Sequence, residues 1–300
     1  KKGKGSAGLE MAYNTSTQFQ AGFLRNPDTQ TDYGMGFNGK YSFVNGKGGG
    51  INDDYGYVWG PKLNVPDPTT ASGFVEIAQF NSPRDLTTGK LIPLPWVTRS
   101  ENNLEKFLNN GLLTTHNISF AGSTDRTDYR ISASQVYQQG QVPGTKLNST
   151  TLNLAGTLRI NDKLSAEASL SYNKQYSPNY PTSGYSPDNY LYNIVLWMGP
   201  EVDINDLKNY WQPGKEGTQQ VNYNYTWYNN PWFLAGEKVR KYSNDVVVAQ
   251  ANMKYDFNKD LKFMLRSGIT NNQANGDSKI PYSYINYGVD AAPFGNYSLN

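Results

Sequence analysis

The sequence predicts an all-β fold in which one antiparallel sheet forms part of a transmembrane β-barrel. Three observations indicate it: segments in which apolar and polar residues alternate, connections that are alternately short and long, and aromatic residues near the ends of the alternating segments. Alternation with a period of two marks a strand whose two faces meet different surroundings. We therefore expect about seven strands, joined by long extracellular loops that contain short helices.

The alternation is clearest over residues 163–176. There Leu164, Leu170 and Tyr172 share one face of the expected strand, and Ser169 lies on the other. Six further segments alternate in the same way. Together the expected strands span residues 7–20, 112–121, 127–137, 150–160, 163–176, 244–257 and 260–271.

The connections between these strands differ greatly in length. Residues 21–111 and 177–243 form two long loops, whereas residues 123–126, 161–162 and 258–260 form tight turns. Because short and longer connections alternate along the chain, all the tight turns lie at one end of the sheet. Barrels of the bacterial outer membrane have this asymmetry, with short periplasmic turns and long external loops.

Aromatic residues near the strand ends also suit a membrane barrel, in which they form girdles at the two interfaces. A soluble β-sandwich is the alternative, since its strands also alternate. Insertions of about 70–90 residues are unusual in a sandwich, where most connections are short. The aromatic residues concerned are Tyr13, Phe120, Tyr129, Tyr137, Tyr172, Tyr255 and Phe257.

Composition narrows the class of protein further. Apolar residues make up 37% of the 300 residues, below the share of about 45–50% in ordinary globular chains, so a thick two-sided core is disfavoured. The net charge of +2 argues against nucleic-acid binding, which needs clustered Lys and Arg. The absence of Cys excludes disulfides and thiol nucleophiles. Because the sequence has no run of about 18 apolar residues, we expect no transmembrane helix. Because no signal peptide opens the sequence, we expect it to be an internal segment.

Two short helices are expected within the long loops. Ser100 is positioned to cap a helix over Glu101–Asn110, and Asp203 to cap one over Ile204–Trp211.

No arrangement of residues indicates catalysis. His116 is the single histidine and lies in an expected strand, without the neighbours that a nucleophile needs. The carboxylates of Asp53, Asp203 and Glu216 are explained by solvation or helix capping more simply than by glycoside hydrolysis. We therefore expect no enzyme activity, no cofactor and no metal site.

The densest cluster of candidate binding residues is aromatic, because four of the six tryptophans lie within residues 176–233. Tyr and Trp dominate binding hot spots and stack on sugar rings or on peptide side chains. The same residues can pack the loop on itself, contact a partner protein or touch a substrate, and the sequence leaves all three open. The candidate contact residues are Trp197, Trp211, Tyr223, Tyr225, Trp227 and Trp232.

Specific stretches resemble the SusC/RagA family of TonB-linked outer-membrane transporters, in the family's own order along most of the chain. Residues 111–120 resemble the family's second barrel strand, and Val202–Lys208 resembles a helix in its long external loop. The other matching stretches are Trp59–Leu63, Asn103–Phe107, Thr127–Ser134, Asn222–Tyr225 and Asn230–Phe233.

The resemblance implies a division of the chain and a role. Residues 1–6 correspond to the end of a plug, and residues 7–300 to the first part of a barrel of 22 strands. The parent protein would import oligosaccharides or peptides across the outer membrane of a Gram-negative bacterium. TonB, acting on the plug, and a SusD-like surface lipoprotein would be its partners. A secreted β-rich glycan-binding module and a polysaccharide-degrading enzyme remain the alternatives.

Overall fold

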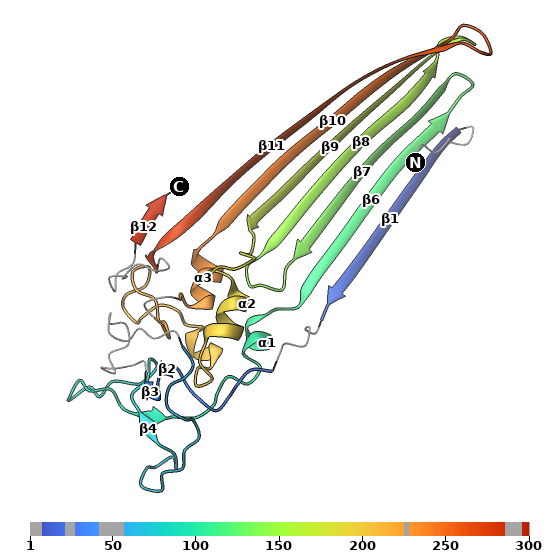
Figure 1. Ribbon diagram of the computed structural model, residues 1–300. Helices are drawn as coiled ribbons and strands as arrows, with labels where there is room; N and C mark the ends of the chain where they lie inside the picture. The colour runs from blue at the N-terminus through green and yellow to red at the C-terminus, as the bar shows by residue number, and fades with distance from the viewer. Residues whose placement is uncertain (1–7, 22–27, 42–56, 225–227, 286–295, 300) are drawn as a thin grey trace.

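The computed structural model describes residues 8–21, 28–41, 57–224, 228–285 and 296–299, and it confirms the predicted all-β fold. Eight strands form one antiparallel sheet in the order β1-β6-β7-β8-β9-β10-β11-β12 (Figure 1). Strands that neighbour each other in the sheet therefore follow one another in the chain, apart from the short strands β2–β5. The eight strands are β1 (Gly8–Gln20), β6 (Gly111–Ser123), β7 (Thr127–Gln139), β8 (Lys146–Arg159), β9 (Leu164–Asn179), β10 (Arg240–Asp256), β11 (Lys262–Tyr284) and β12 (Asn296–Leu299).

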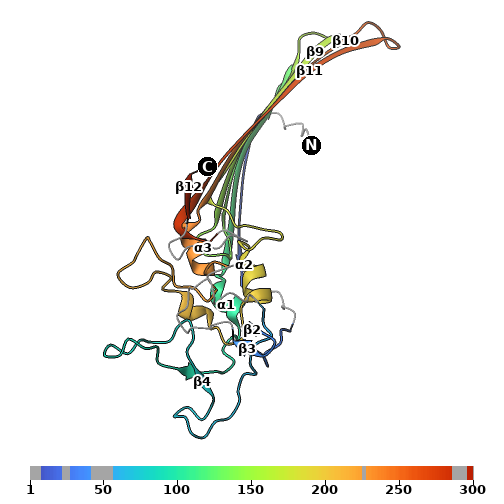
Figure 2. The same ribbon diagram turned by 60° about the vertical axis from the view of Figure 1, so that its left-hand side comes forward.

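Strand register gathers the large apolar side chains on one face of the sheet, which we call the apolar face. One transverse row crosses seven strands with every position apolar, and its neighbours on that face are largely apolar too. Figure 2 shows the sheet as a single layer, with every helix beyond one of its ends, and the large side chains of this face are widely exposed. The row consists of Met11, Phe120, Ile131, Leu154, Leu170, Ala249 and Ile269.

The opposite face, which we call the polar face, is held by hydrogen bonds between side chains of neighbouring strands. Ser171 Oγ donates to Asn153 Oδ1 at 2.8 Å. Glu167 on β9 accepts a hydrogen bond from Lys254 Nζ at 3.0 Å. Charged residues of this face, such as Glu167 and Lys254, thus pair across strands instead of packing into a core.

The strands lie where the alternation predicts them, but several are longer. β8 begins at Lys146, β10 at Arg240, and β11 continues to Tyr284. These extensions lack the alternation of apolar and polar residues, because both of their faces are largely polar. The eighth strand, β12, was not predicted.

The tight turns after β6, β8 and β10 lie together at one end of the sheet, as predicted (Figure 1). The two long loops gather at the other end, where they form a second structural region that we call the cap. It comprises the described parts of residues 28–110 and 180–239. Its helices are α1 (Asn103–Phe107), α2 (Tyr190–Tyr192), the π-helix η1 (Asn193–Trp197), the 3₁₀ helix η2 (Ile204–Leu207) and α3 (Pro231–Glu237).

Two small hairpins complete the cap. β2 (Gly36–Phe37) pairs with β3 (Lys40–Tyr41), and β4 (Glu76–Ile77) pairs with β5 (Leu94–Pro95). Among the described residues, no helix is both long enough and apolar enough to cross a membrane.

Candidate functional site

The hydrophobic core of this chain lies in the cap, where both long loops contribute to it. Phe107 of the first loop and Phe233 of the second are fully buried. Trp232 joins them, because its ring meets the Phe107 ring edge-on at 4.9 Å between centroids. The cap is thus a small globular unit built from two segments that are far apart in the sequence.

Two of the predicted contact residues, Trp211 and Trp232, pack against this core. Trp232 Nε1 donates to the Ile204 carbonyl at 2.9 Å. The Trp211 ring meets Phe233 edge-on at 5.4 Å. Both are partly buried and join η2 and the following chain to α3.

Two further candidates, Trp197 and Tyr223, also contribute to the cap. Tyr223 is buried, and its hydroxyl donates to Asn193 Oδ1. Burial raises the pKa of this hydroxyl well above its ordinary value, so Tyr223 stays a neutral donor. Trp197 stacks on Tyr228 at 5.6 Å. Tyr225 and Trp227 lie outside the described residues, and contact of the six candidates with a partner or a substrate stays a prediction.

A network of buried amide side chains fixes the second loop, and the sequence analysis did not single it out. Asn230 caps α3 by accepting from Trp232 N at 2.8 Å, and its Nδ2 donates to the Leu207 and Val221 carbonyls at 2.7 and 2.9 Å. Asn with Pro at the next position is a helix-start signal, so α3 was recognisable. The other buried amides of the second loop are Asn193, Gln220, Asn222, Asn224 and Asn229.

The same network ties the cap to the end of β11. Gln220 Nε2 donates to the Ser283 carbonyl at 2.6 Å. Asn229 Nδ2 donates to the Ile285 carbonyl at 2.9 Å, and Ile285 N donates back to Asn229 Oδ1 at 2.8 Å. Buried amides left without partners would cost about 1–3 kcal/mol each, so these paired contacts select one loop conformation.

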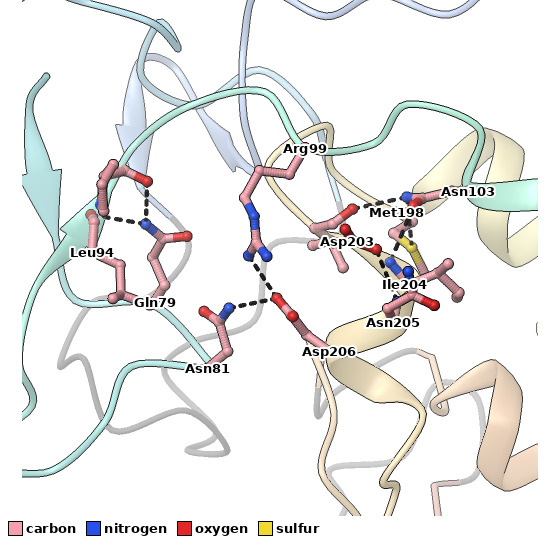
Figure 3. A network of polar contacts seen from close by, with 12 residues as sticks. Gln79, Asn81, Leu94, Arg99, Asn103, Met198, Asp203, Ile204, Asn205 and Asp206 are labelled. Atoms are coloured by element: carbon pink, nitrogen blue, oxygen red, sulfur yellow. Dashed lines mark hydrogen bonds and ion pairs between the residues drawn. The ribbon is translucent and has the colours of Figure 1, made fainter. Parts of the chain in front are cut away.

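Polar side chains join the first loop to the second, as Figure 3 shows. Arg99 Nη1 lies 2.6 Å from Asp206 Oδ2, which also accepts from Asn81 Nδ2 at 2.7 Å. Asn103 Nδ2 donates to the Val202 carbonyl at 2.8 Å, and Asn103 Oδ1 accepts from Ile204 N at 3.0 Å. The start of α1 and the start of η2 therefore hold each other in place.

This junction corrects one of the two predicted helix starts. Ser100 does not cap α1, because the N-cap position is Asn102 and the helix begins at Asn103. The Ser100 backbone N–H instead donates to the Pro200 carbonyl at 2.9 Å. Asp203 does cap η2, since Oδ1 accepts from Asn205 N at 2.9 Å. η2 ends at Leu207, before the predicted end at Trp211, because that tryptophan pairs with Gln220 in an antiparallel bridge.

Glu201 is a buried carboxylate at the same junction. Met35 N lies 3.1 and 3.2 Å from its two carboxylate oxygens and donates to them across the two loops. Gly199 leaves room for the carboxylate, since a Cβ there would lie 2.4 Å from Oε2. Burial raises the pKa of Glu201 to about 7, although backbone N–H groups partly oppose the shift.

A partly buried charge cluster closes the second loop over the sheet. Asp188 pairs with Lys238 and accepts from the Tyr284 hydroxyl at 2.9 Å. The Lys238 amine lies 3.9 Å from the centre of the Tyr284 ring. Burial lowers the pKa of Lys238 from its ordinary value, and the charge of Asp188 opposes that shift.

Exposed aromatic residues gather in the first loop, where the sequence analysis did not look for them. Trp59 is 59% exposed, and its ring lies 5.9 Å from that of Tyr33. Tyr57 lies 5.6 Å from Phe37, and both are exposed. The cap therefore presents aromatic surface through its first loop.

His116 lies in β6 on the apolar face, at the level where that face becomes polar. Its Nδ1 lies 2.9 Å from the Tyr13 hydroxyl and 3.0 Å from Thr15 Oγ1. Within the described part of the chain, no three His, Asp or Glu side chains are grouped to hold a metal ion.

Comparison with known proteins gives matches at the level of structure. No protein-family profile matches the chain, and no curated protein matches its sequence. A structure of the RagAB peptide importer in its closed-closed state is similar over 99% of this chain, with 17% identity and a TM-score of 0.53. The open-open state is similar over 95%, with 17% identity and a TM-score of 0.57.

This chain shares the fold of part of RagAB. It spans 31% and 30% of the length of the two matched RagAB chains. The observed sheet with its cap is accordingly a partial antiparallel β-barrel, the fold that the sequence predicts.

Proposed function

We propose that this chain forms part of the barrel wall and external loops of an outer-membrane importer that works with TonB and a SusD-like surface lipoprotein. The single observation that carries the proposal is the contrast between the two faces of the sheet. A wide band of large apolar side chains is exposed on one face, while the other face is polar and hydrogen-bonded. A wall between hydrocarbon and a watery lumen needs this contrast.

The height of the apolar band supports the proposal. On β9 the band runs from Leu164 to Tyr172, and Lys174 ends it. Those eight residue steps correspond to about 27 Å along the strand, or about 20 Å at a tilt of about 40°. Barrels of the outer membrane carry an apolar band about 25 Å tall. Next to Lys174, Asp245 makes β10 polar at the same level, with 3.7 Å between the charged atoms.

Peptides are the cargo that we favour over oligosaccharides, because both matched structures are of a peptide importer. A lipoprotein partner would sit on the cap, since the cap projects from the sheet end opposite the tight turns (Figure 1). The proposal assigns transport to the parent protein and no catalysis to this chain.

Membrane insertion and uptake test the proposal on the complete protein. We expect it to fractionate with the outer membrane, to need detergent for solubility, and to take up fluorescent hexapeptides only while TonB is energised. Folding in aqueous buffer without detergent would instead support a secreted glycan-binding module. Peptide uptake that continues without TonB would contradict the proposed mechanism.

A further inference from the structure

A cleft of about 740 Å³ opens in the cap between the two long loops. Its walls come from residues 28–31, from residues 98 and 100–105, and from residues 194–196, 198 and 200, with Val58 beside them. A cleft of this size is within the range of ligand-binding sites, which extend from about 300 to 1,000 Å³.

One wall of the cleft is apolar and comes from the π-helix η1. Val195, Leu196 and Met198 line it, and Leu104 of α1 adds to it. Leu196 is 56% exposed, which is unusual for a leucine beside a packed core. π-helical turns are rare and are found frequently at functional sites. This wall therefore offers apolar surface to a ligand side chain.

The other wall is acidic. Glu101 and Glu105 line the cleft at the start of α1, and both are exposed. Neither makes an ion pair among the described residues. Asp28 is a third acidic residue of the lining, and the described lining contains no Lys or Arg.

The basic residues next to these glutamates in the sequence are directed elsewhere. Arg99 binds Asp206 and Lys106 binds Asp203, both in the second loop. Both cations thus join the loops, Arg99 as Figure 3 shows, and negative charge remains on the cleft side of α1. The like charges of Glu101 and Glu105 repel each other, and a cation bound between them would reduce this repulsion.

We propose that this cleft binds a peptide segment in which Lys or Arg stands beside an apolar side chain. The inference deepens the proposed function, on which it rests, by naming the class of peptide. The carboxylates of Glu101 and Glu105 receive the cationic group, and Leu196 and its neighbours receive the apolar group. Charge complementarity selects this occupant over an acidic or neutral peptide.

Binding of three synthetic hexapeptides to the complete protein in detergent tests the inference. One peptide alternates leucine with lysine, and the others carry glutamine or glutamate in place of lysine. We expect the lysine peptide to bind at least tenfold more tightly than the glutamate peptide, which corresponds to about 1.4 kcal/mol. This advantage declines as salt is added, because the glutamates are exposed.

Matched variants locate the effect. The double variant Glu101→Gln, Glu105→Gln keeps the shape of both side chains. It is expected to weaken binding of the lysine peptide about tenfold and to change the affinity for the glutamine peptide by less than twofold. Glu216→Gln changes an exposed glutamate of the cap outside the cleft and should leave all three affinities unchanged. Leu196→Ser is expected to weaken all three peptides.

Equal affinity for the lysine and glutamate peptides would overturn the inference. So would a double variant that loses affinity for the lysine peptide and for the glutamine peptide by the same factor. Loss of a co-purifying protein partner in the double variant, with peptide binding unchanged, would overturn it in favour of a docking role. Energised uptake of all three peptides at one rate would refute this inference and leave the proposed function standing. Failure of all three peptides to enter would count against the proposed function itself.

Discussion

The sheet and the cap place the same kinds of side chain in opposite surroundings. In the cap Phe233 is fully buried and Asn230 satisfies its amide inside the core, as in a water-soluble domain. In the sheet Leu154 is 44% exposed, while Asn153 on the opposite face hydrogen-bonds to Ser171. One chain thus contains a region built for water and a region that, under the proposed function, is built for lipid. The apolar residues alone do not distinguish the two regions, since both need them.

Truncation of a core residue gives the sharpest separation of the two regions. Phe233→Ala is expected to destabilise the cap by about 3–5 kcal/mol, because it removes buried surface and leaves a cavity. Hydrogen exchange of the complete protein in detergent should show faster exchange throughout the cap and no change in β7–β9. Leu154→Ala is the matched control on the apolar face, where detergent or lipid fills the space. Faster cap exchange in both variants would show that the regions are not independent.

Introduction of charge tests which face of the sheet meets lipid. Leu170→Arg is expected to destabilise the inserted protein by about 2–4 kcal/mol, because it places a cation on the lipid face near the midplane. Ser169→Arg, one residue away on the polar face, should be tolerated. The fraction of protein that resists unfolding in cold SDS measures assembly. Equal damage from both variants would contradict the assigned facing.

The junction of the two loops should respond to pH through Glu201. Because burial raises its pKa to about 7, the folded cap binds a proton more tightly than the unfolded chain does. The cap should therefore be more stable at low pH and lose stability as the pH rises from about 4.5 through 7. Glu201→Gln is expected to remove this dependence while keeping an acceptor for the Met35 amide. Hydrogen exchange at the Met35 amide, followed between pH 5 and 8, measures the pH dependence of cap stability. An unchanged pH dependence in the variant would refute its assignment to Glu201.

Prediction of the strands succeeded where the two faces differ and failed where they do not. β9 alternates over its whole apolar stretch and lies close to its predicted bounds. Residues 271–278 of β11 are largely polar on both faces, so the continuation of this strand gave no periodic signal. Aromatic density in the second loop left internal packing, partner contact and substrate contact open, and the structure packs Trp232 and Tyr223 into the cap. Trp59, in the first loop, is exposed.

The sequence by itself determined the β-class, which residues share a face of each predicted strand, and the end of the sheet that carries the loops. It could do so because period-two alternation and connection length are local properties of the chain. Only the tertiary structure decided that residues about one hundred positions apart, such as Arg99 and Asp206, form one cap. It also decided that Glu101 and Glu105 face a cleft while Lys106 faces the second loop. Those outcomes depend on how two loops pack against each other, which no local pattern encodes.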